Sequence, residues 1–206
     1  MRTGFSTSAC AAAAAAAALR QIFTGIETKQ ITINLPAVKE AVFSIINYPK
    51  QPDAICCGVI KDAGDDPDVT NFLEIQAVVR KIETKKIFMF GGQGVGRVTL
   101  PGLPVSVGEA AINPGPRKLI LQIFNNELQK YNIDSGFEIT IQVPEGERVA
   151  EQTMNPKLGI VGGISILGTD GLVRPYSAPA FRTSLFYELR VAYENGLTAI
   201  GLATGK

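Results

Sequence analysis

The 206-residue sequence contains no histidine and no tryptophan. Without histidine, the chain has no Ser-His-Asp or Cys-His catalytic pair, no imidazole base and no histidine ligand for a metal ion. Acid–base chemistry therefore falls to Asp, Glu, Lys, Tyr or Cys. Only three cysteines are present, and the neighbours Cys56 and Cys57 are two of them, so no CxxC spacing exists. This pattern predicts reduced, buried thiols in place of a disulfide framework or a zinc site.

Net charge is also nearly absent, because 20 Lys and Arg balance 19 Asp and Glu to leave +1. No overall field attracts nucleic acid or an anionic membrane, so we expect neither as a partner. The longest apolar run, residues 9–19, is far shorter than the roughly 20 residues that span a bilayer. With 46% hydrophobic residues, the composition predicts a globular protein, which we place in the cytoplasm.

The apolar run of residues 9–19 is mostly alanine. Its position after Arg2 is also compatible with a secretory signal. Alanine is the best helix former, however, and Thr7 and Ser8 are candidate N-cap residues, while Gly25 stands where a terminating glycine belongs. We therefore predict a folded helix whose small side chains let neighbouring elements approach closely.

Apolar periodicity predicts the remaining elements. Alternating residues predict a hairpin over residues 30–35 and 40–46. An apolar run interrupted by glycines predicts a strand or hairpin over residues 158–167. Further strands are expected at residues 54–60, 73–82, 87–90, 137–143 and 198–203, and helices at residues 114–131 and 180–195.

This order of elements favours an α+β domain over residues 1–178. Residues 179–206 contain a helix, a glycine turn and an apolar strand, which is typical of the opening of a parallel α/β unit. We predict that they are the first helix and strand of a second, apparently truncated α/β domain. The alternative is that they complete the first sheet.

Two loops combine polar groups with helix or strand ends. Thr3, Gly4 and Thr7 precede the alanine helix, where free N–H groups favour an anion, although plain capping explains them too. Residues 61–68 crowd four aspartates behind a buried strand. A solvated turn is one interpretation of that crowding. In the other interpretation, Lys61 holds an anion and an aspartate accepts a proton. The candidate acceptors are Asp62, Asp65 and Asp66.

A third loop, residues 91–97, is rich in glycine but is followed by two prolines within residues 98–104. Because dinucleotide and P-loop turns both lead into a helix, this context argues against a nucleotide-binding module. Gly94 and Gly96 instead suit the close approach of a large flat ligand, with Arg97 for an acidic group.

The remaining donor-rich positions follow Asn-Pro or glycine turns. Arginine is disfavoured in the first turn of a helix, so Arg117 needs a partner there. Together with Arg97 and Arg174 it would suit a ligand with several carboxylates, although each alone is typical of a surface arginine. The other candidate binding residues of these turns are Asn113, Asn155, Gly162 and Gly163.

Five blocks of the sequence, in order, resemble the cobalt-precorrin-5B C1-methyltransferase family of anaerobic cobalamin biosynthesis. They run from residue 2 to residue 169, and the wider resemblance extends to about residue 177. The blocks are RTGFSTSACA at 2–11, VIKDAGDDPDVT at 59–70, GVGRVTLPGLPV at 94–105, AINP at 111–114 and NPKLGIVGGISILGT at 155–169.

The resemblance implies methyl transfer from S-adenosylmethionine to C1 of a cobalt-corrinoid ring, giving cobalt-precorrin-6A. The ring brings its own cobalt, so no protein metal site is required. It also implies a first domain similar to the ribosomal S5 second-domain arrangement, followed by an α/β domain that family members continue further. The alternative is a non-catalytic corrinoid-binding domain. The sequence assigns neither ring nor cofactor to a particular loop and leaves the oligomeric state open.

Overall fold

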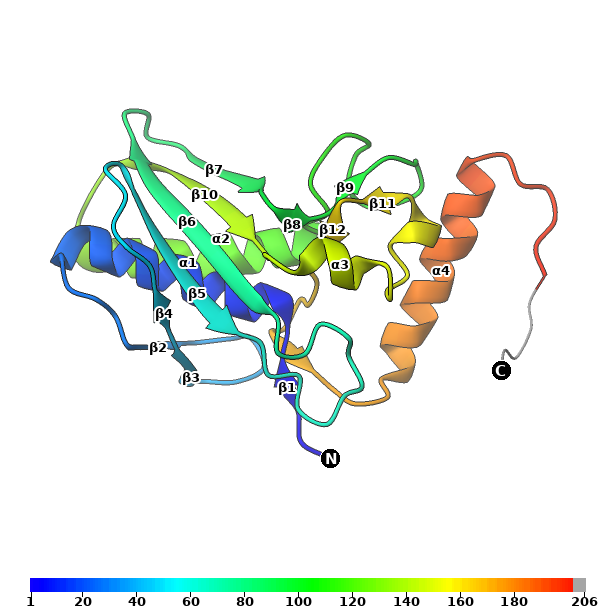
Figure 1. The fold of residues 1–206 in the computed structure, drawn as a ribbon, viewed down its shortest axis with the longest axis horizontal. Helices are drawn as coiled ribbons and strands as arrows, with labels where there is room; N and C mark the ends of the chain where they lie inside the picture. The colour runs from blue at the N-terminus through cyan, green and yellow to red at the C-terminus, as the bar shows by residue number, and fades with distance from the viewer. Residues whose placement is uncertain (202–206) are drawn as a thin grey trace.

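The computed structural model describes residues 1–201 and shows a mixed α+β fold (Figure 1). Its main sheet has five strands in the order β4-β5-β6-β10-β7, antiparallel except for the parallel pair β10 and β7. The strands are β4 (Ile46–Asn47), β5 (Ala54–Ile60), β6 (Glu74–Ile82), β7 (Ile87–Gly91) and β10 (Gly136–Gln142).

One face of this sheet carries the core, because successive side chains of a strand point to opposite faces. Cross-strand register places Ile55, Val79, Ile139 and Met89 in one row on the buried face. Two helices, α1 (Thr7–Thr24) and α2 (Pro114–Leu128), lie against each other behind the sheet (Figure 1). The strands predicted at residues 54–60, 73–82, 87–90 and 137–143 are thus confirmed as β5, β6, β7 and β10. The helix predicted over residues 114–131 is confirmed too, its last turn being a 3₁₀ turn (Gln129–Tyr131).

The alanine helix α1 is enclosed on all sides. Every residue from Ala9 to Leu19 is fully buried, between the sheet, α2 and the hairpin of β2 (Gln30–Ile33) and β3 (Ala41–Ser44). The predicted N-caps Thr7 and Ser8 are wrong: Ser6 is the cap, because its hydroxyl accepts from the amide of Ala9 and satisfies a free donor of the first turn. Gly25 ends the helix in the left-handed conformation, as predicted.

The remaining strands are short and form two-stranded pairs outside the main sheet. The predicted hairpin is confirmed as β2 (Gln30–Ile33) and β3 (Ala41–Ser44). Over residues 158–167 a glycine-interrupted strand or hairpin is predicted, and the structure has two short strands there that do not pair with each other. There, β11 (Ile160–Val161) pairs with β9 (Arg97–Val98), and β12 (Gly163–Ile164) pairs with β8 (Gly94–Val95). Tertiary pairing of two distant loops replaces local pairing. Also present are β1 (Gly4–Phe5), β13 (Leu172–Val173), α3 (Gly146–Ala150) and a 3₁₀ turn (Pro156–Leu158).

The last helix, α4 (Ala178–Glu194), confirms the helix predicted over residues 180–195 and packs on a second, smaller core. Val191 is its buried contact residue. The predicted strand at residues 198–203 is absent from residues 198–201, and its last two residues lie outside the described part of the chain. Within residues 1–201, α4 is followed by no strand of the main sheet. Among these residues, none of the helices combines the length and hydropathy needed to cross a bilayer.

Candidate functional site

Residues 165–171 join the N-terminal ends of α1 and α2. The amide of Ser8 donates to the carbonyl of Leu167 at 3.1 Å, and the amide of Asn113 donates to that of Ile166 at 3.4 Å. A parallel bridge between Ile112 and Ile166 fixes the second attachment. The two helices therefore present their N-terminal ends, where partial positive charge accumulates, to one segment of the chain.

The hydroxyl groups in front of α1 are bonded to this same segment. Thr7 Oγ1 donates to the carbonyl of Leu167 and accepts from its amide, at 3.2 and 2.8 Å. Ser8 Oγ donates to the carbonyl of Gly168 at 2.7 Å. These contacts match the capping interpretation of the loop, since its own chain already satisfies the donors that an anion would use.

The acidic loop 62–68 lies directly against the N-terminal segment. A Cβ added at Gly4 would stand 2.0 Å from the carbonyl carbon of Ala63, and one added at Gly64 would stand 2.4 Å from the carbonyl oxygen of Arg2. Thr3 forms an antiparallel bridge with Gly64. Two glycines thus let the two backbones meet at a distance that any side chain would prevent.

The three predicted proton acceptors each bind groups of other segments. The guanidinium of Arg2 forms a bidentate pair with Asp62 at 2.6 and 2.8 Å. The amide of Arg2 donates to Asp65 at 2.6 Å, and the amide of Tyr176 donates to Asp66 at 3.2 Å. The hydrogen bonds from Arg2, and then from the amide of Gly64, lower the pKa of Asp62. Asp62 is therefore held as a carboxylate and is a weak proton acceptor.

Lys61 lies inside the protein, with its side chain 1% exposed. Its ammonium donates to Asp68 Oδ2 at 2.7 Å. The anion that Lys61 holds in this structure is therefore a carboxylate of its own chain. Asp68 in turn accepts from the amide and hydroxyl of Thr70 at 2.8 and 2.6 Å, which fixes the end of the acidic loop.

The three thiols are buried and unpaired, as predicted. Burial raises the pKa of Cys10 and of Cys57 to about 12 and that of Cys56 to about 11. Because the thiolate is the nucleophilic form, none of the three is poised for nucleophilic chemistry near neutral pH.

The glycine loop at residues 91–97 is built into the fold. A Cβ added at Gly94 would lie 1.8 Å from the carbonyl oxygen of Val143, and one added at Gly163 would lie 2.1 Å from that of Gly94. A Cβ added at Gly96 would lie 2.7 Å from the carbonyl oxygen of Gly163. These three glycines are buried and let three backbone segments pack together, whereas Gly162 is exposed with open space around it.

Asn155 closes this cluster of backbones. Its side chain is nearly buried, donates to the carbonyl of Gly163 at 2.8 Å and accepts from the hydroxyl of Ser165 at 3.0 Å. The side chain therefore holds residues 163–165, which lead into segment 165–171, in place. Asn113 differs: it precedes the first residue of α2, and its side chain makes no capping bond.

The three predicted ligand arginines stand on different elements. Arg97 in β9 donates to the carbonyl of Gly108, Arg117 in α2 donates to that of Met89 at 3.1 Å, and Arg174 pairs with Asp170 at 2.6 Å. Each of these bonds uses one guanidinium nitrogen, Nη1. Since a guanidinium has five N–H donors, each arginine retains donors for a ligand.

The predicted site residues thus fall into two groups linked by segment 163–174. One group surrounds the N-terminal end of α1: Thr3, Gly4, Thr7, Lys61, Asp62, Asp65, Asp66 and Arg174. The other surrounds β8 and β12: Gly94, Gly96, Arg97, Asn155, Gly162 and Gly163. Asn113 and Arg117 lie between them at the start of α2.

Sequence reasoning missed the partners that organise the first group. Arg2 neutralises Asp62 across 60 positions of sequence, and Asp68 neutralises Lys61. The sequence shows a loop with four aspartates that needs a cation, but it does not specify that Arg2, 60 positions away, supplies it.

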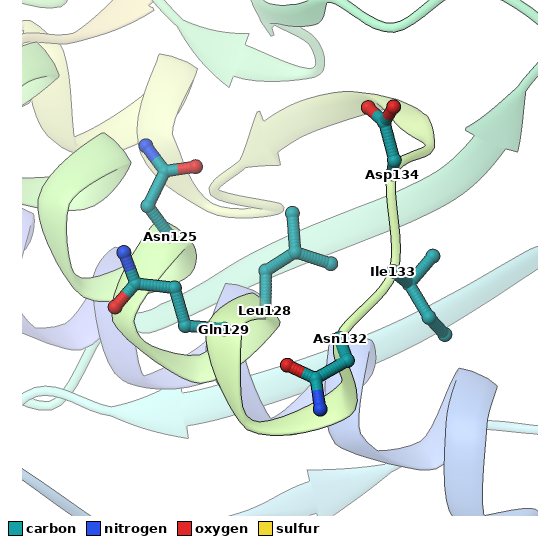
Figure 2. A pocket seen from close by; sticks show the side chains of 6 residues that line it. All are labelled: Asn125, Leu128, Gln129, Asn132, Ile133 and Asp134. Carbon is teal, nitrogen blue, oxygen red and sulfur yellow. The ribbon is translucent and has the colours of Figure 1, made fainter.

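A separate cavity of about 650 Å³ lies at the C-terminal end of α2 (Figure 2). It opens between the end of α2 and residues 132–134, and its lining includes Asn125, Gln129 and Asp134. None of the predicted site residues lines this cavity.

The fold, together with the two groups of loop residues around the N-terminal end of α1 and around β8 and β12, defines a mixed α+β protein with a candidate small-molecule site. The chain belongs to the CbiD family, whose profile matches residues 1–175.

Named relatives and a solved structure are similar over nearly the whole chain. A protein named cobalt-precorrin-5B C(1)-methyltransferase from Geobacillus sp. (strain WCH70) is 47% identical over 205 residues, which cover 100% of this chain and 56% of that protein. The Picrophilus torridus protein of the same name is 45% identical, with 99% and 60% covered. The crystal structure of the cobalamin biosynthesis protein cbiD from Archaeoglobus fulgidus matches with a TM-score of 0.65 and 32% identity, over 91% of this chain and 59% of that one. The chain thus spans little more than half the length of these relatives.

Proposed function

We propose that the chain acts in methyl transfer from S-adenosylmethionine to C1 of cobalt-precorrin-5B, giving cobalt-precorrin-6A in cobalamin biosynthesis. The observation that carries the proposal is the 47% identity, over the whole chain, with a protein named for this reaction. We place the reaction in the cytoplasm, with the cobalt belonging to the substrate ring.

In this proposal residues 1–178 are the corrinoid-handling domain, with an arrangement similar to the second domain of ribosomal S5. The five-stranded sheet backed by α1 and α2 supports this arrangement. Residues 179–206 open a second α/β domain. The contact between α4 and the small core joins it to the first domain, because the other buried residues of that core lie within residues 98–160.

The chemistry of the exposed residues fits a ring bearing many carboxylates. Arg97 and Arg174 are exposed and keep free guanidinium donors, and the side chain of Asn113 is available beside α2. Arginine binds carboxylates in a planar, two-point geometry, so these groups would orient the ring as well as bind it.

S-Adenosylmethionine supplies a methyl group already activated by its sulfonium. The main task of the protein is then to align ring carbon, methyl group and sulfur, and alignment alone can contribute several kcal/mol, up to roughly 7–11 kcal/mol in the best cases. Asp65 and Asp66 are the aspartates that remain available if a proton must be removed, whereas Arg2 keeps Asp62 ionised and weakly basic.

The first experiment is a calorimetric titration of the 206-residue chain with S-adenosylhomocysteine, followed by a single turnover with methyl-labelled cofactor and cobalt-precorrin-5B. Cofactor binding near the micromolar range, about 8 kcal/mol, together with label transfer supports the proposal. Ring binding without label transfer would support the alternative, a non-catalytic corrinoid-binding domain.

Substitution of the acidic loop tests the proton acceptors. Asp65→Asn and Asp66→Asn are compared with Asp134→Asn, which lies in the cavity at the other end of α2. A loss of single-turnover rate in the first two, but not in the control, supports a proton-transfer step. Unchanged rates in all three variants would mean that this loop contributes to alignment and not to proton transfer.

A further inference from the structure

The outer face of the main sheet, the face turned away from α1 and α2, carries two exposed aromatic side chains (Figure 1). Phe88 and Phe90 alternate with the buried Met89 along β7, so both point to this outer face. They are 40% and 47% exposed, and their rings stack with centroids 6.4 Å apart. Because β7 is an edge strand, the two rings form an aromatic surface at the edge of the sheet.

Cross-strand register extends this surface onto β10 and β6. Thr140 lies beside Phe90, and Val78 lies beside Thr140, each with its side chain half-buried. We call Phe88, Phe90, Thr140 and Val78 the platform. The glycine loop borders it, because a Cβ added at Gly92 would lie 2.9 Å from Cγ2 of Thr140. The platform therefore ends where the loop predicted to approach a large flat ligand begins.

Two of the three predicted ligand arginines flank the end of β7. Arg117 donates to the carbonyl of Met89 at 3.1 Å. Arg97 forms a bridge with Ala110. Ala110 in turn touches the end of β7, because a Cβ added at Gly91 would lie 2.6 Å from the Cβ atom of Ala110. Both arginines are thus attached to the strand that carries the aromatic rings.

Within residues 1–201, these two arginines have no carboxylate partner. Neither forms a salt bridge there, and each donates to a main-chain carbonyl. Arg174 differs, because it pairs with Asp170. In the row of Phe88, Glu138 and Arg80 stand directly opposite each other on neighbouring strands, so their charges offset. The end of β7 therefore offers two uncompensated guanidinium groups beside an aromatic surface.

Folding alone does not favour exposed phenylalanines on an edge strand. An exposed apolar edge invites pairing with another chain, and edge strands are usually protected by charged residues. A planar conjugated ligand that carries carboxylates matches both features of the site. A conjugated ring stacks on aromatic side chains, and arginine binds carboxylates in a two-point geometry.

We propose that the platform, together with Arg97 and Arg117, is the binding site of the substrate ring. The ring lies flat against Phe88 and Phe90, and its carboxylates pair with the two guanidinium groups. This places the ring across the end of β7 and adds two aromatic contact residues to the arginines. The identity of the ring rests on the proposed function, whereas its location rests on the platform and its charges.

Binding of coloured cobalt corrins to the 206-residue chain tests the location without requiring turnover. The two probes are a cobalt corrin whose side chains end in free carboxylates and the same ring with these groups as amides. The carboxylate form should bind at least about tenfold more tightly, because only it forms charge-assisted bonds with arginine. Arg97→Gln should remove most of this preference while changing the affinity for the amide form by less than about twofold.

A tryptophan reporter locates the bound ring, because the sequence contains no tryptophan. Phe88→Trp keeps an aromatic side chain on the platform, and it should lose most of its emission when the light-absorbing corrin binds. Phe181→Trp is the matched control, since Phe181 is also exposed but lies in α4, well separated from β7 (Figure 1). Its emission should change much less.

Serine variants test the contribution of the rings. Phe88→Ser combined with Phe90→Ser should weaken the binding of both probes by at least about tenfold, because stacking on an aromatic side chain is lost. Phe181→Ser should leave both affinities unchanged. If the double variant unfolds, the reporters still decide, because they retain an aromatic side chain.

Equal quenching of the two reporters would overturn the location and leave the proposed function intact. Full affinity in a folded double serine variant would do the same. Absence of binding to the wild-type chain would overturn both proposals. Dimerisation that is lost in the double variant while ring binding persists would assign Phe88 and Phe90 to contact with a second copy of this chain.

Discussion

The ammonium of Lys61 lies 2.7 Å from the carboxylate of Asp68, and 1% of the lysine side chain is exposed to solvent. The pair joins the end of strand β5 to the end of the acidic loop. Burying a charge costs free energy unless an opposite charge compensates it, so each member of the pair offsets the desolvation cost of the other. Lys61, predicted to bind an anion, therefore helps to fix the conformation of the acidic loop, which carries the candidate proton acceptors.

Removal of either partner should destabilise the protein unequally. Asp68→Asn leaves the buried ammonium uncompensated and should lower the free energy of unfolding by about 3–5 kcal/mol. Lys61→Met should cost less, because the Asp68 side chain is 23% exposed and water can solvate it. Denaturant unfolding of both single variants and the double variant checks this. Strictly additive losses in the double variant would contradict direct coupling.

Acid should destabilise the protein through the same pair. Burial by itself would raise the pKa of Asp68, but the charge and hydrogen bond of Lys61 and the bonds from Thr70 outweigh it and lower the pKa. The stabilisation is therefore complete above the ordinary aspartate pKa of about 3.9 and is lost as the pH falls through the lower folded value. Unfolding free energies measured from about pH 5 to pH 2 should fall less steeply in Lys61→Met than in the wild type. Identical slopes would show that Lys61 does not set this pKa.

Enlarging a side chain of α1 should destabilise the core. Ala13 is fully buried, so Ala13→Leu adds volume where no space exists and should cost about 1–3 kcal/mol or more. The control is Ala180→Leu, because Ala180 is exposed on α4. Thermal and denaturant unfolding compare the two. A neutral Ala13→Leu would mean that the helix and sheet can separate without loss of packing.

A methyl group on Gly94 should be far worse than one on Gly108. Both glycines have positive φ, +67° and +88°, so both alanine variants carry backbone strain of roughly 1–2 kcal/mol. Only at Gly94 would the new Cβ also meet a carbonyl oxygen, at 1.8 Å. We expect Gly94→Ala to unfold at markedly lower denaturant concentration than Gly108→Ala. Equal midpoints would indicate that the glycine loop is loosely packed.

We expect the main contribution of Asn155 to be to the stability of the protein and not to ligand binding. Asn155→Ala leaves the carbonyl of Gly163 and the hydroxyl of Ser165 without their partner, which should cost about 1–3 kcal/mol. Asn126→Ala on the exposed side of α2 is the control and should be neutral. If Asn155→Ala kept full stability but lost ring binding, the side chain would be a ligand contact and not a clamp.

Local signals in the sequence were sufficient for the major elements. The alanine run, the terminating Gly25 and the apolar spacing of residues 114–131 fixed both core helices, because helix formation depends on neighbours three and four residues apart. Apolar runs and alternation likewise located the long strands. They did not give the pairing over residues 158–167, where each short strand pairs with a strand about 60–70 residues away.

The sequence by itself excluded histidine chemistry and a strong net charge, and it located the helices and long strands. By resemblance to known blocks it also indicated the family. Only the tertiary structure decided which charges meet. Arg2 binds Asp62 because Gly4 and Gly64 allow two distant backbones to touch, and Lys61 is buried because the acidic loop folds back over it. The physical reason is range: propensity and periodicity act over a few residues, whereas ion pairs and close backbone packing depend on segments that the folded chain brings together.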